Sequence, residues 1–120
     1  MINIRDIVGN YRNKIYESKN LQLNDASQYL VELSALMGNV MEELNFRQGE
    51  YHRKFVELLQ GTENGLKNSV AKTTILAKAT IEFEKLEEVK GLRETVLEMV
   101  RALKYRCRAL SDEIEVSRNL

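Results

Sequence analysis

The feature that most constrains this chain is a heptad pattern of apolar residues in its C-terminal third. We call the residues of this pattern the seam: Leu86, Val89, Arg93, Val96, Val100, Leu103, Cys107, Leu110 and Ile114. Arg93 alone interrupts it with a charge. Side chains three and four residues apart share one face of an α-helix, so the pattern predicts a long helix whose seam packs against other helices.

The remaining composition favours an all-α fold. The 120 residues include no proline and only 6 glycines. Proline removes a backbone donor and clashes with the preceding helical turn, so its absence is typical of long helices. A short first helix is predicted over residues 3–17, with Asn3 as its N-cap and one apolar face. That face comprises Ile4, Ile7, Val8, Tyr11 and Ile15.

A long second helix is predicted over about residues 25–60, capped by Asn24 or Asp25. Its apolar positions follow a coiled-coil rhythm, and Arg47 occupies one slot. They are Ala26, Leu30, Leu33, Met37, Val40, Leu44 and Tyr51. The stretch GTENGLKN, Gly61 to Asn68, has no such rhythm and predicts the tip of a helical hairpin.

Ser69 is expected to cap a third helix over residues 69–116, which would complete a long antiparallel hairpin. We therefore expect one helical domain over residues 1–120. The helices carry more apolar surface than the few elements of one chain can bury. This predicts a homo-oligomeric helical bundle. Within the seam, Arg93 is expected either to fix register or partner number, or to extend its charged end into water.

The sequence gives little support for catalysis. It holds one histidine, His52, and one cysteine, Cys107, which lies in the seam and is expected to act as a small apolar residue. It contains no metal-binding or phosphate-loop motif, so we expect a non-enzymatic protein without metal or cofactor. The single cysteine and the absence of a signal peptide or membrane span predict a cytoplasmic protein.

Positive charge is clustered although 18 Lys and Arg balance 18 Asp and Glu. Arg101, Lys104 and Arg108 recur on one helix face with Tyr105 beside them, whereas Arg106 points elsewhere. A second group, Lys67, Lys72 and Lys78, occupies a stretch without acids around the start of the third helix. Both groups are candidate phosphate-binding surfaces, and the alternative is that they are solvated flanks of structural helices.

The order of these parts resembles the phage recombination mediators. The similarity covers roughly residues 25–115 and consists of a long helix, a glycine-containing break and a motif that opens the last helix. The motif residues are Ser69, Lys72, Leu76, Ala77, Lys78 and Ala79, followed by LRETVLEMVRALKYRCRALSDEIE.

The resemblance implies a non-enzymatic oligomer that binds single-stranded DNA through basic residues and loads a recombinase onto it. Carried over by position, Lys67, Lys72 and Lys78 are the first candidates for DNA binding. Arg101, Lys104 and Arg108 form a second patch. Such a phage-encoded protein acts in the cytoplasm of its host cell. The alternative is a protein–protein interaction module: a phage structural component, an assembly chaperone or an inhibitor of a host protein.

Overall fold

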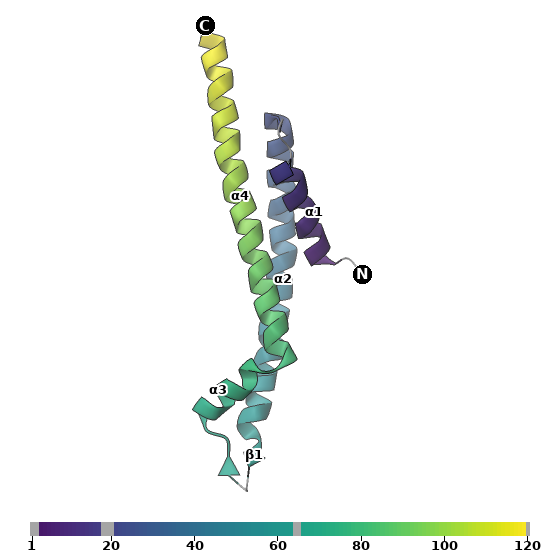
Figure 1. The fold of residues 1–120 in the computed structure, drawn as a ribbon, viewed down its shortest axis with the longest axis vertical. Helices are drawn as coiled ribbons and strands as arrows, with labels where there is room; N and C mark the ends of the chain where they lie inside the picture. The colour runs from purple at the N-terminus through teal and green to yellow at the C-terminus, as the bar shows by residue number, and fades with distance from the viewer. Residues whose placement is uncertain (1–2, 18–20, 64–65, 120) are drawn as a thin grey trace. The chain divides into compact units, whose positions relative to one another are not determined.

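The computed structural model describes residues 3–17, 21–63 and 66–119 (Figure 1). Its helices are α1 (Ile4–Glu17), α2 (Leu23–Gln60), α3 (Val70–Lys78) and α4 (Ile81–Asn119). Two short strands, β1 (Thr62–Glu63) and β2 (Leu66–Lys67), lie between α2 and α3. The predicted all-α fold with a helical hairpin is confirmed.

The chain divides into two compact units. The first unit comprises Met1–Val40 and Leu92–Leu120, and the second comprises Met41–Gly91. The helices α2 and α4 each contribute one part to either unit. The expectation of a single domain over residues 1–120 stays a prediction.

The first unit is a packing of α1 with the N-terminal part of α2 and the C-terminal part of α4 (Figure 1). Asn3 caps α1 as predicted, because its side-chain oxygen accepts a hydrogen bond from the Arg5 amide at 3.0 Å. Tyr11 of α1 meets Tyr29 of α2 edge to face. The buried apolar side chains of this unit are Val8, Ile15, Leu21, Ala26, Leu33, Leu36, Val40, Val96, Met99 and Leu103.

The second unit packs the C-terminal part of α2 against the first turns of α4, with α3 attached. Leu44, Leu86 and Val89 are buried in it. The rings of Tyr51 on α2 and Phe83 on α4 lie 5.7 Å apart between centroids. Thr73 and Ala77, one turn apart, form the buried face of α3.

The predicted break at residues 61–68 does end α2, and it contains a short β-ladder that the sequence pattern did not predict. The strands β1 and β2 pair antiparallel. Asn68 closes this connection, because its backbone amide donates to the Gly61 carbonyl at 3.2 Å. The Asn68 side-chain amide also donates to the Leu58 carbonyl at 2.8 Å, which satisfies an acceptor at the end of α2.

The prediction of one continuous helix over residues 69–116 is wrong. Ser69 does cap α3, accepting from the Lys72 amide, but that helix stops at Lys78. Thr80 then starts α4: its hydroxyl donates to the Ala77 carbonyl at 2.6 Å and accepts from the Phe83 amide at 3.3 Å. The same side chain therefore satisfies the end of α3 and the beginning of α4.

Two helix boundaries and two core positions also differ from prediction. The helix α2 begins at Leu23, so neither Asn24 nor Asp25 is its cap, and α4 continues to Asn119. Leu36 and Met99 are buried, whereas their neighbours Met37 and Val100 are only half-buried. A straight helix drifts about 20° per heptad against a strict seven-residue repeat, so the buried face moves off a heptad column along the helix.

Candidate nucleic-acid interface

The first cationic group forms a continuous exposed face on α4. Arg101, Lys104 and Arg108 follow each other at one-turn intervals, and all three are exposed. Tyr105 lies on the same face with 77% of its surface exposed. Leu103, which is fully buried, fixes this orientation, because burying it turns the cations toward solvent. We call Arg101, Lys104, Tyr105 and Arg108 the cationic face.

The three cations of this face are available for a ligand. Within residues 3–17, 21–63 and 66–119, no hydrogen bond or ion pair engages Arg101, Lys104 or Arg108. Elsewhere on the helices, ion pairs between neighbouring turns do occur, as between Arg47 and Glu43 at 2.8 Å. Charges without an intramolecular partner can bind phosphates without first breaking an ion pair.

The second cationic group lies in the second unit, on β2 and α3. Lys67 and Lys78 are exposed, and Lys72 is half-buried. Because α3 ends early, Lys78 stands in its last turn, where a cation is favoured by the helix dipole. Lys72 therefore lies in the first turn of α3 and Lys78 does not, although the sequence predicted both near the start of this helix. The two cationic groups belong to different units.

Much of the predicted oligomer seam is buried within a single chain. Leu86, Val89, Val96 and Leu103 are covered, which leaves Val100, Cys107, Leu110 and Ile114 accessible in part. Ile114 is 41% exposed. Whether this remainder joins chains stays a prediction.

Arg93 is not sealed inside the seam. About a third of its side chain, 34%, is exposed, and its Nη2 lies 3.5 Å from the Glu94 carboxylate. Within one chain, this position corresponds to the expectation that the charged end extends toward water.

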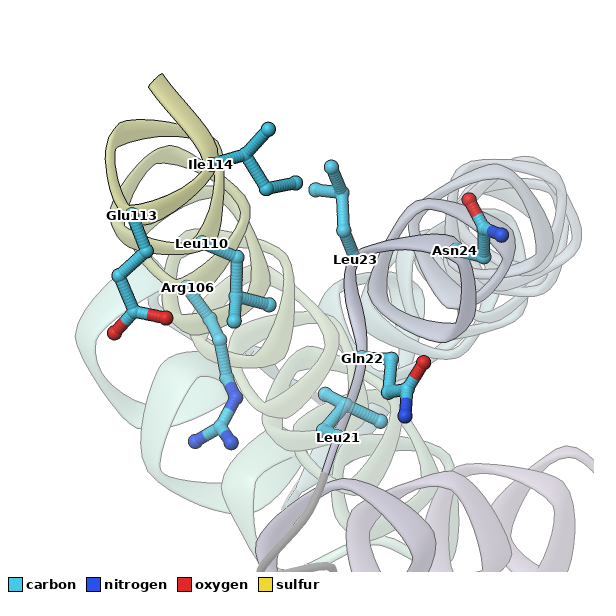
Figure 2. A pocket seen from close by; sticks show the side chains of 8 residues that line it. All are labelled: Leu21, Gln22, Leu23, Asn24, Arg106, Leu110, Glu113 and Ile114. Atoms are coloured by element: carbon cyan, nitrogen blue, oxygen red, sulfur yellow. The ribbon is translucent and has the colours of Figure 1, made fainter. Parts of the chain in front are cut away.

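Two grooves flank α4 in the first unit. The α1–α4 groove, about 470 Å³, runs between the end of α1 and α4, and Ile15, Tyr16, Tyr105 and Ala109 are among its lining residues. The terminal groove, about 750 Å³, lies between the Leu21–Asn24 segment and α4. Figure 2 shows Ile114 of α4 pointing across it toward Leu23.

Arg106, Glu113 and Tyr16 line these grooves and were not among the sequence-based candidates. Arg106 and Glu113 line both of them, and Tyr16 lines the α1–α4 groove. The sequence offers one signal for Tyr16: successive residues on a helix are about 100° apart, so burying Ile15 leaves Tyr16 at the flank of the buried face. No comparable signal marked Glu113.

The described residues form no cluster of metal ligands and no helix that could span a membrane. In the parts of the chain that the structure describes, no three His, Cys, Asp or Glu side chains cluster as metal ligands would. His52 is exposed on α2, and Cys107 is a half-buried free thiol. None of the helices in those parts combines the length and the apolar character that crossing a bilayer requires.

Comparisons with known protein families, curated proteins and solved structures returned no significant match to this sequence.

Proposed function

We propose that this chain is a non-enzymatic, self-associating helical protein that binds single-stranded DNA as an accessory in phage recombination. In this proposal it acts in the cytoplasm of the host cell, beside a recombinase. The observation that carries the proposal is the cationic face, where unpaired cations and a 77% exposed tyrosine share one side of α4.

The chemistry of this face fits a single strand. Guanidinium and ammonium groups bind phosphates without regard to sequence, and an exposed ring offers a stacking surface for bases. Bases in a duplex are already stacked on each other, so Tyr105 could contribute only where bases are unpaired. The combination therefore favours a single strand over a duplex.

Self-association would strengthen weak binding. The net charge of the chain is +0, so one cationic face has little long-range attraction to add to its local contacts. Several copies on one strand convert weak contacts into avidity. The partly accessible end of the seam, Cys107, Leu110 and Ile114, is the surface on α4 that could join such copies.

A matched pair of charge reversals tests the proposal. Lys104→Glu on the cationic face and Lys85→Glu elsewhere on α4 change the net charge equally, and both side chains are exposed. We expect Lys104→Glu to weaken binding to a labelled oligothymidylate much more than Lys85→Glu. Circular dichroism controls for folding. Equal effects of the two variants would show that only overall charge matters.

A protein–protein interaction module is the second candidate, and α3 favours it. This helix exposes Val70 and Ile75, at 65% and 72%, and Leu76 at 38%. Ile75 and Leu76 are neighbours on α3, and adjacent exposed aliphatic side chains of this kind occur in docking surfaces. Ile75→Glu would abolish partner capture in this case and leave oligonucleotide binding intact.

A further inference from the structure

Small side chains on α4 leave space for the α1–α4 groove. Ala102 and Ala109 are seven residues apart, so they lie on one stripe of the helix, and both line the groove. Tyr105 and Arg106 stand on either side of this stripe, one residue apart in sequence. Its volume, about 470 Å³, falls within the usual range of small-ligand pockets.

Two exposed tyrosines border this space. Tyr16 from α1 is 57% exposed and Tyr105 from α4 is 77% exposed. Among the described residues, ring contacts engage Tyr11, Tyr29 and Tyr51, but neither Tyr16 nor Tyr105. Two tyrosine rings that make no ring contact within the described residues offer stacking surfaces for a planar ligand at this groove.

The same groove supplies one hydrogen-bond donor group and one acceptor group. Arg106 and Glu113 both line it, and across the described ranges neither side chain has a hydrogen bond or an ion pair. A guanidinium donates to ring nitrogens and carbonyls, and a carboxylate accepts from exocyclic amines or, in thymine, from the ring N3–H, so together they can meet the edge of a base.

We propose that the α1–α4 groove binds an unstacked nucleobase between Tyr16 and Tyr105 while the strand's phosphates follow the cationic face. This inference rests on the proposed single-stranded DNA binding and adds to it a specific site for bases. Arg106, Leu110 and Glu113 also line the terminal groove, so the strand can continue there beyond the bound base.

Two probes separate base binding from phosphate binding: an oligothymidylate and an abasic oligonucleotide of equal length, which has the same phosphates without bases. We expect wild type to bind the oligothymidylate more tightly. Tyr16→Ala and Tyr105→Ala should each lower that affinity on the order of 10-fold, since base–aromatic stacking has about this effect per base. Neither substitution should change the affinity for the abasic strand.

Matched variants control for folding and for general loss of apolar surface. Tyr16→Phe keeps the ring and should bind as wild type does. Phe46→Ala removes an aromatic side chain that is 53% exposed on α2 in the second unit, and it should have no effect. The chain contains no tryptophan, so Tyr105→Trp introduces a single tryptophan, whose fluorescence should be quenched by the oligothymidylate and not by the abasic strand.

The outcomes distinguish this inference from the proposed function. If wild type binds both strands equally, or if Tyr16→Ala and Tyr105→Ala leave oligothymidylate binding unchanged, the base site is wrong and phosphate binding stands. If wild type binds neither strand, the base site and the proposed function are both wrong.

Discussion

The rings of Tyr11 and Tyr29 meet edge to face, with centroids 6.1 Å apart and planes at 82°, and they join α1 to α2. Tyr11 also interacts with Glu32, one turn beyond Tyr29. Burial, followed by hydrogen bonding with Glu32, raises the pKa of Tyr11. Hydrogen bonds with Gln28 and then with Tyr11 lower the pKa of Glu32.

Tyr11→Phe should destabilise the first unit in a pH-dependent way. Because folding lowers the pKa of Glu32, its contribution to the free energy of unfolding is present above its ordinary pKa. That contribution is lost as pH falls through the pKa that Glu32 has in the folded protein. Because folding raises the pKa of Tyr11, its contribution to the free energy of unfolding is lost as pH rises through the pKa that Tyr11 has in the folded protein. The difference in melting temperature between wild type and variant should therefore be largest near neutrality.

Thermal melts followed by circular dichroism at a series of pH values measure this difference. Tyr16→Phe is the control, because the Tyr16 hydroxyl has no partner in the described part of the chain. A difference that stays constant from acid to alkaline pH would rule out the Tyr11–Glu32 contribution.

Thr80→Ala should lower the free energy of unfolding by about 1 kcal/mol, because it removes the N-cap of α4. Thr74→Ala is the matched control: Thr74 lies inside α3, where its hydroxyl donates back to the Val70 carbonyl and alanine is the better helix former. Chemical denaturation measures both variants. A Thr80→Ala variant as stable as wild type would contradict the boundary between α3 and α4.

Met99→Ala should lower the free energy of unfolding by roughly 2–5 kcal/mol, as expected for a truncated side chain with 0% exposure. Val100→Ala, at the neighbouring half-buried position, should cost clearly less. The comparison tests which residue of α4 faces the core. A larger loss for Val100→Ala would favour the strict heptad assignment made from sequence.

Wild type should be a homo-oligomer in light scattering, and Ile114→Glu should lower its mass. Ile114 is 41% exposed, so a single chain tolerates the charge, whereas an apolar contact between copies does not. Val116→Glu is the control, since Val116 is 60% exposed near the same helix end but outside the seam. A monomeric wild type at high protein concentration would be inconsistent with the proposed self-association.

Local signals in the sequence predicted the elements well where each signal was unambiguous. Asn3 and Ser69 cap their helices as expected, and the glycine-containing stretch after Gln60 ends α2. The break at Thr80 was missed because no glycine or proline marks it. A threonine followed by two acids in the first turn of α4, Glu82 and Glu84, was the available signal.

The candidate site was predicted only in part. Helical periodicity was enough to place Arg101, Lys104, Tyr105 and Arg108 on one face, because all four belong to one helix. The groove beside them could not be predicted, since it depends on how α1 packs against α4. The periodicity of one helix shows which of its residues share a face, but it does not show which other helix packs against that face.

Titration of a labelled oligothymidylate with wild-type protein at salt concentrations from about 50 to 200 mM tests the central claim most directly. Measured by fluorescence anisotropy, the affinity should fall steeply with salt, with a log–log slope of about −0.7 for each phosphate contacted. Reversing Arg101, Lys104 and Arg108 together should flatten that slope. Absence of binding at the lowest salt, with the protein folded, would contradict single-stranded DNA binding by this chain.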